Sequence, residues 1–205
     1  MKKSIFLVIL SVVFTSVVSA QGFYFDVGFG GGKAWTKHGE YDVVKELRLH
    51  GENFNELAMN LGLKAGGGPF RSIPIYIVGE FSIANHMLLP SSGHMTFSTF
   101  MIGPGVIFYP IPLIQLGASV GYSYTMNMYN TNDLQWGGFR FHDATGFGWN
   151  VSLAADLGSG NNGVLIGVKY FHTSSTTMHT FVDQSSSMLG LFVRYAYRKK
   201  TARLF

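Results

Sequence analysis

The segment Leu113–Tyr129 alternates between apolar and small polar side chains over its whole length. One set of alternate positions holds Ile114, Leu116, Ala118, Val120, Tyr122, Tyr124, Met126 and Met128, and the positions between them hold glutamine, glycine, serine, threonine and asparagine. A period of two residues predicts a β-strand. Strands in soluble proteins are usually about five or six residues long, whereas this one, when tilted, would cross roughly 25 Å of hydrocarbon. We therefore expect its apolar face to contact lipid.

The same alternation recurs along the chain and predicts about eight strands in total. The other predicted strands are Gly22–Lys33, Phe54–Lys64, Ile73–Ala84, Thr96–Tyr109, Thr145–Leu157, Val164–His172 and Leu189–Tyr197. Longer polar connections are predicted at Trp35–Asn53, Asn85–Met95, Asn130–Asp143 and Thr173–Ser186, and short turns at Gly66–Pro69, Pro110–Pro112 and Gly158–Gly163. A helical turn is expected around Val43–Leu49. Connections that alternate in length are typical of an antiparallel barrel with short periplasmic turns and longer external loops.

Charged residues of the predicted strands share the side that carries the small residues. They are Asp26, Glu56, Lys64, Glu80, Asp156, Lys169 and Arg194. Charges in a narrow interior are costly unless paired, so we expect Arg194 to pair with Asp26, or Lys169 and Arg194 to cluster with Glu80. A packed polar core is the main interpretation, and a narrow conductive or gated path is the alternative. A soluble, lipocalin-like barrel would place its apolar residues inward and its charges outward.

Aromatic residues fall near both ends of the predicted strands. The expected lower group is Phe23, Phe108, Tyr109, Tyr195 and Tyr197, and the expected upper group is Tyr122, Tyr124, Phe147, Trp149 and Tyr170. Two aromatic girdles at the membrane interfaces are typical of outer-membrane barrels. The pattern predicts the fold class as all-β, a transmembrane antiparallel up-and-down β-barrel with both chain ends on the periplasmic side.

The start of the chain has the pattern of a secretory signal peptide. Two lysines precede the apolar run Ile5–Phe14, and small residues lead to Ala20, which predicts cleavage there. We therefore divide the 205 residues into a signal peptide, 1–20, and a barrel domain, 21–205. Charged residues make up only 13% of the chain and cysteine is absent, so stability must come from the strand ladder. No basic stripe interleaves with the aromatic residues, and nucleic acid is not an expected partner.

The last predicted strand, Leu189-Gly190-Leu191-Phe192-Val193-Arg194-Tyr195, is similar to the signal that outer-membrane barrels present to the barrel assembly machinery. Gly190, Val193 and Tyr195 stand in the matching places. Over Gly22–Tyr197 the chain resembles the small eight-stranded outer-membrane barrels of the OmpA-domain, OmpX and OmpW type. The resemblance implies outer-membrane lipid and the assembly machinery as partners.

The segment Gly167–Ser174 contains a candidate catalytic pair, His172 and Ser174. Both residues are predicted to face outward near the lipid headgroups, where an imidazole beside a hydroxyl could activate an oxygen nucleophile. The segment is similar to the His-x-Ser motif of PagL-type lipid A deacylases, and that resemblance implies Ser174 as nucleophile and His172 as base. The acid that orients the histidine in that family would come from the start of the last strand, and Asp183 is the nearby acid. The non-catalytic interpretation is a polar rim.

The other histidines are His38, His50, His86, His94, His142 and His179, and all are predicted to lie in external loops. Their spacing does not suggest converging ligands, so we expect no metal and no cofactor. The main functional interpretation is non-enzymatic: an envelope structural or surface-interaction protein, or an uptake route for small hydrophobic molecules, with such molecules or host surface molecules as partners. The alternative is a bilayer-facing lipid A acyl ester hydrolase.

Overall fold

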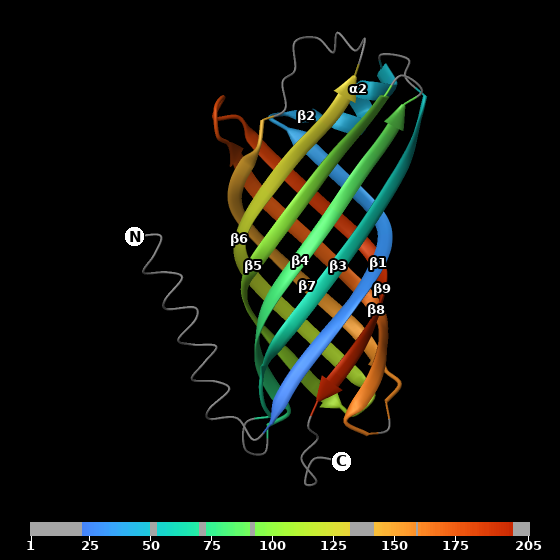
Figure 1. Ribbon diagram of the computed structural model, residues 1–205, viewed down its shortest axis with the longest axis vertical. Helices are drawn as coiled ribbons and strands as arrows, with labels where there is room; N and C mark the ends of the chain where they lie inside the picture. Colours follow the sequence, from blue (N-terminus) through green and yellow to red (C-terminus); the bar gives the residue numbers. More distant parts are fainter. Residues whose placement is uncertain are drawn as a thin grey trace.

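The computed structural model describes residues 22–49, 53–69, 73–90, 93–131, 142–158 and 160–198. Most of these residues lie in long strands. The barrel strands are β1 (Phe23–His38), β3 (Phe54–Gly67), β4 (Ile75–Pro90), β5 (Gly93–Ile111), β6 (Ile114–Thr131), β7 (Ala144–Asp156), β8 (Asn162–Thr177) and β9 (Asp183–Arg198). A short strand, β2 (Tyr41–Asp42), and a helix, α2 (Val43–Leu49), connect β1 to β3. Figure 1 shows both of these elements at the upper rim of the barrel.

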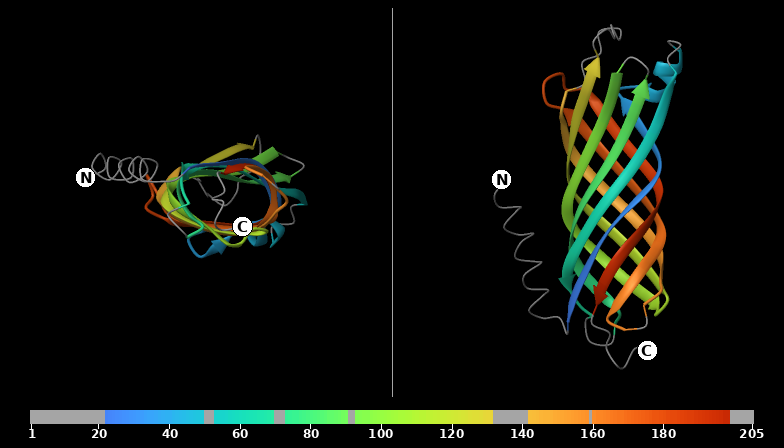
Figure 2. Two further views of the ribbon diagram at one scale, coloured as in Figure 1. Left: turned by 90° about the horizontal axis from the view of Figure 1, so that it is seen from below. Right: turned by 45° about the vertical axis from the view of Figure 1, so that its right-hand side comes forward.

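The strands form one closed antiparallel sheet. Each barrel strand pairs with the next one along the chain, and β1 also pairs with β9 from Tyr24 to His38. This last pairing closes the sheet, so the view along the axis in Figure 2 shows a ring of strands. The predicted fold class, an all-β, transmembrane, antiparallel up-and-down barrel of eight strands, is confirmed.

The register of the strands fixes the width of the interior. Following the paired residues from Gly28 of β1 through every strand returns to β1 at His38, ten residues further along the chain. An eight-stranded barrel with this stagger has strands tilted by about 40° and an interior just wide enough for side chains. The residues of the strands themselves must therefore fill the barrel.

The two faces of the strands differ in polarity as the alternation predicts. Apolar side chains face outward around the middle of the barrel, where Phe29 and Leu191 are 70% and 67% exposed. Asp26, Lys64 and Glu80 face inward, and each is at most 1% exposed. A lipocalin-like barrel has the reverse arrangement. The structure therefore indicates lipid, not water, as the surroundings of the outer face.

Several strands run further than the sequence predicts, and the difference lies at the upper end of the barrel. The predicted loop Asn85–Met95 is mostly strand, because β4 ends at Pro90 and β5 begins at Gly93. Most of the predicted loop Thr173–Ser186 is also strand, since β8 and β9 extend into it. The expected alternation of long and short connections is wrong at these two places. In β8 and β9 the side chains above the apolar belt are polar, and the backbone pairing continues through them.

One residue of the predicted lower girdle faces the opposite way. Tyr109 is 1% exposed and packs edge-on against Tyr76 inside the barrel, with ring centroids 6.0 Å apart. Adjacent residues of a strand point to opposite faces, so Tyr109 could not share the outward face with Phe108. Tyr122 and Phe147 are both more than half exposed and lie on the outer face as predicted.

The ladder between β1 and β3 is incomplete at its upper end. Their last register pair is Gly32 with Ala58. Above it, β1 remains paired with β9, and only its final residues pair with β2, while β3 remains paired with β4. Two stretches, Lys33–Thr36 of β1 and Phe54–Leu57 of β3, are therefore not paired with each other. They are termed the β1–β3 notch.

Helix α2 follows β2 and lies beside this notch. Its buried residues Val43 and Leu47 pack against Leu88, Met95 and Phe97, which are inward-facing residues of β4 and β5. The helix begins where the carboxylate of Asp42 accepts a hydrogen bond from the backbone N–H of Lys45 at 3.1 Å, which caps the first turn. The helical turn predicted at Val43–Leu49 is confirmed, and it covers the upper lumen.

Some predictions fall outside the described residues. The signal peptide at 1–20, most of the loop Asn130–Asp143 and the end of the barrel domain at 199–205 lie outside the described residues and remain predictions. Within the described ranges, no helix combines the length and the apolar character that are needed to cross a membrane.

An arginine on the outer face should destabilise the barrel according to its depth in the bilayer. Val193 lies in the middle of β9 and is 44% exposed, so Val193→Arg is expected to lower the free energy of unfolding by about 2 to 4 kcal/mol in phospholipid vesicles. Thr176→Arg, at the upper end of β8, should cost less than about 1 kcal/mol. Urea unfolding followed by tryptophan fluorescence measures both, and equal losses would contradict the orientation.

Candidate functional site

The carboxylate of Glu80 lies inside the barrel between two lysines. The Nζ atom of Lys169 donates a hydrogen bond to Oε1 at 2.9 Å, and the Nζ atom of Lys64 lies 3.2 Å from Oε2. The hydroxyl of Ser82 donates to Oε1 at 2.5 Å, and that of Ser119 donates to Oε2. All five residues are at most 3% exposed. This group, termed the Glu80 cluster, joins β3, β4, β6 and β8 across the lumen.

A second ion pair joins β1 to β9. The Nη1 atom of Arg194 lies 3.6 Å from Oδ1 of Asp26, and the hydroxyl of Tyr24 donates to Oδ2 of Asp26 at 2.7 Å. A side chain at Gly62 would begin 3.2 Å from Arg194 Nη2, so the glycine leaves the guanidinium its space. The predicted pair of Arg194 and Asp26 is confirmed. Of the predicted cluster of Lys169, Arg194 and Glu80, the contact of Lys169 with Glu80 is present, whereas the described ion pair of Arg194 is with Asp26.

A third group closes the lower end of the lumen. Arg198 Nη2 lies 2.5 Å from Oδ2 of Asp156, and its guanidinium lies 4.8 Å from the centroid of the Tyr109 ring. The amide of Gln115 donates to the hydroxyls of Tyr24 and Tyr109 at 2.8 and 2.7 Å. The last strand is predicted to end at Tyr197, but β9 continues to Arg198, which is 1% exposed. Arg198 follows Arg194 by four residues, so the alternation along the strand places both on the inward face. The sequence pattern could therefore have predicted Arg198 as a residue of the interior.

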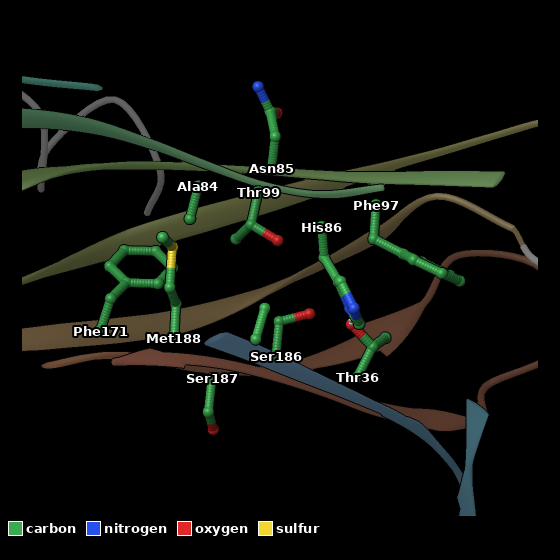
Figure 3. Close-up of a pocket in the computed structure, with 11 residues that line it drawn as sticks. Thr36, Ala84, Asn85, His86, Phe97, Thr99, Phe171, Ser186, Ser187 and Met188 are labelled. Carbon is green, nitrogen blue, oxygen red and sulfur yellow. Dashed lines mark hydrogen bonds between the residues drawn. The ribbon is translucent and has the colours of Figure 1, made fainter. Parts of the chain in front are cut away.

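The upper lumen contains a small cavity, shown in Figure 3, with a volume of about 10 Å³. Phe171 and Met188 lie at one end of it and His86 and Thr36 at the other. The Thr36 hydroxyl and His86 Nδ1 are 2.9 Å apart, and His86 Nε2 lies 3.3 Å from Oε1 of Glu56. The prediction that His86 lies in a loop is wrong, because it faces inward from β4 and is 3% exposed. A cavity of this size holds about one water molecule.

The lumen is thus a stack of paired polar groups with an apolar cap at the top. The groups from bottom to top are the Arg198–Asp156 pair, the Arg194–Asp26 pair, the Glu80 cluster, the His86 contacts and the buried face of α2. His38, another histidine predicted in a loop, is the last residue of β1 and is 8% exposed. Among the residues that the structure describes, no group of three potential metal ligands converges.

The candidate catalytic residues lie at the upper rim of β8. His172 pairs in register with Ser187 of β9, and its Nδ1 atom lies 2.9 Å from the Ser187 hydroxyl. The His172 ring also packs against Trp149, with centroids 5.7 Å apart. Ser174 is exposed and pairs in register with Ser185. The hydroxyl that meets the imidazole in this structure is therefore that of Ser187.

Asp183, the acid expected near His172, has a different partner. Asp183 pairs in register with Thr176, and its Oδ1 atom accepts a hydrogen bond from the Thr176 hydroxyl at 3.4 Å. In a catalytic triad the acid hydrogen-bonds to the histidine. The described contacts of His172 are those of a polar rim that bridges β7, β8 and β9.

Removing the carboxylate of Glu80 should leave two buried ammonium groups without a counter-charge. Glu80→Gln is therefore expected to lower the free energy of unfolding by about 3 to 5 kcal/mol. Glu56→Gln is the matched control, because the Glu56 side chain is 21% exposed and its loss should cost about 1 kcal/mol or less. Urea titrations of both variants in the same vesicles measure the difference. Similar small losses for the two variants would show that the Glu80 cluster does not hold the barrel together.

Comparison with known proteins gives matches in structure but not in sequence. No protein-family profile and no curated protein matches the chain. Ail, the attachment invasion locus protein of Yersinia pestis, is 15% identical with a TM-score of 0.52, and the match covers 85% of this chain and 99% of Ail. The comparisons give no support to the resemblance to PagL-type deacylases.

Two further matches have lower scores. OprG from Pseudomonas aeruginosa is 11% identical with a TM-score of 0.44, covering 88% of this chain and 97% of OprG. Neisserial surface protein A is 12% identical with a TM-score of 0.46, covering 84% of this chain and 95% of that protein. The match to Ail, at 15% identity and a TM-score of 0.52, indicates a shared fold and not a shared activity. By its closed ladder, its apolar outer face and its likeness to Ail, the chain is a small eight-stranded β-barrel of the outer-membrane type.

Proposed function

We propose that this protein is a non-conducting integral barrel of the outer membrane that holds its upper rim at the cell surface, in an envelope structural or surface-interaction role. The observation that carries the proposal is the Glu80 cluster, which joins four strands across the lumen through buried ionic contacts. A water-filled channel needs a continuous polar space, whereas this interior is occupied by paired side chains. The remaining cavity of about 10 Å³ is too small for a solute.

Uptake of small hydrophobic molecules through the lumen is the weaker variant of this proposal. A drug-sized ligand occupies about 300 Å³ or more, far above the volume of the lumen cavity. Passage would require the ion pairs and the α2 cap to separate together. The structural and surface-interaction role needs no such rearrangement.

The proposed orientation places α2 outside the cell. The first strand begins and the last strand ends at the lower end of the barrel (Figure 1), and the two longest connections between barrel strands, from β1 to β3 and from β6 to β7, lie at the upper end. The longer loops of outer-membrane barrels face outward and the shorter turns face the periplasm, which supports periplasmic chain ends. The proposed partners are outer-membrane lipid along the apolar belt, the barrel assembly machinery at β9 and surface molecules at the rim.

The purified, folded protein should carry no steady current across a planar lipid bilayer. The expected trace stays at baseline at all applied voltages, because the buried ion pairs leave no open path. Its folded state is checked in the same sample by its faster migration in SDS gels before boiling than after. Reproducible unitary currents from a folded sample would contradict the proposal.

Replacing the candidate nucleophile should leave the membrane lipids unchanged. We expect Ser174→Ala cells to show the same lipid A acyl pattern as wild-type cells, because the described imidazole contact is with Ser187. Mass spectrometry of extracted lipid A makes the comparison, with cells that lack the protein as the reference. If the wild type removed an acyl chain that the variant and the reference both retain, the acyl hydrolase alternative would replace the structural one.

A further inference from the structure

A cleft of about 370 Å³ opens beside the β1–β3 notch, where α2 lies next to the interrupted ladder. Lys33 and Trp35 line it from β1, Glu56 from β3, and Lys45, Arg48 and Leu49 from α2. Its volume is more than thirty times that of the lumen cavity. The cleft exists because β1 and β3 separate above Gly32 and Ala58, and a seven-residue helix covers only part of the gap.

The cleft has an excess of available positive charge. Lys33, Lys45 and Arg48 are all exposed, and none of them belongs to the ion pairs formed among the described residues. The two acids of the cleft have other contacts. Asp42 caps α2, and Glu56 lies beside His86. An anion with several oxygen atoms would therefore meet three cations that have no carboxylate partner in the described structure.

The same cleft has apolar walls and lies near the edge of the lipid belt. Trp35 is 37% exposed and Leu49 is 69% exposed. Lys33 follows Phe29, a belt residue, by four positions on β1, which is about 10 Å along the barrel axis at this strand tilt. Lysine and tryptophan side chains at this height are typical of the headgroup region. Lys33 also lies over the Trp35 ring, with Nζ 6.0 Å from the centroid.

We propose that the cleft binds the phosphate monoester headgroup of an anionic lipid in the outer leaflet. The ammonium groups of Lys33 and Lys45 and the guanidinium of Arg48 would hold the phosphate oxygens, since arginine can donate two parallel hydrogen bonds to a phosphate. Trp35 and Leu49 would contact the upper part of the acyl chains, which continue down the apolar belt. This inference rests on the proposed orientation, because the cleft meets the outer leaflet only if α2 faces outward.

Native mass spectrometry of the full, folded protein in neutral detergent tests the site. The probe is dioleoyl phosphatidic acid, a lipid with a phosphate monoester, and dioleoyl phosphatidylcholine is the zwitterionic reference. We expect the wild type to bind phosphatidic acid at least about tenfold more tightly than phosphatidylcholine, because a charge-assisted hydrogen bond contributes at least this factor. The triple variant Lys33→Gln, Lys45→Gln, Arg48→Gln should bind it on the order of a hundredfold more weakly than the wild type.

The matched control removes three positive charges from the other end of the chain. Lys199→Gln, Lys200→Gln, Arg203→Gln should bind phosphatidic acid as the wild type does. The proposal is overturned if the folded triple variant of the cleft binds as well as the wild type, or if the control loses as much affinity. Displacement of the lipid by an equal concentration of inorganic phosphate would also overturn it, in favour of a free phosphate site. None of these results affects the conductance measurement, so the proposed function is tested separately from the lipid site.

Discussion

The narrow interior of the barrel is the constraint on which the other features depend. Eight strands with a stagger of ten residues leave room for side chains only, so water cannot solvate the charges that face inward. Each such charge must therefore find an opposite charge or a hydrogen-bonding partner on a neighbouring or facing strand. Glu80 does so with Lys64 and Lys169, and Asp26 does so with Arg194. The proposed lack of conductance rests on the same geometry.

The outer face has the opposite constraint, because lipid offers no hydrogen bonds. The strand backbone satisfies itself through the closed ladder, and the outward side chains of the middle section are apolar. The ladder between β1 and β3 stops at the pair Gly32 and Ala58, below the upper ends of both strands. At this height the surroundings change from hydrocarbon to headgroups and water, which can satisfy unpaired backbone groups. The interruption and the basic cleft therefore lie where an opening in the wall costs least.

The alternation of side chains predicted the fold and the outward face of the eight barrel strands, with Tyr109 assigned to the wrong face, because lipid outside and paired charges inside impose a strict period of two. It could not predict where strands end, since pairing continues above the lipid with polar residues on both faces, as in the upper part of β8. Partners across the lumen depend on the register. Arg194 and Asp26 could be matched by parity, whereas the contact of His172 with Ser187 needed the alignment of β8 with β9. The notch could not be predicted from the alternation, because both strands continue there. Above Gly32 and Ala58, β1 stays paired with β9 and β3 with β4, and only the pairing between β1 and β3 is lost.

Site-directed spin labelling along β6 tests the central claim most directly. The chain contains no cysteine, so single cysteines can be placed at the outward positions Leu116 and Val120 and at the inward positions Ser119 and Ser123, and labelled after reconstitution into vesicles. The account predicts that collisions with oxygen, which concentrates in lipid, are frequent at the outward pair, and that the inward pair is shielded from both oxygen and a water-soluble nickel chelate. Frequent collisions of the nickel chelate with the inward labels would show a water-filled lumen, and a reversed oxygen pattern would show that the two faces are exchanged.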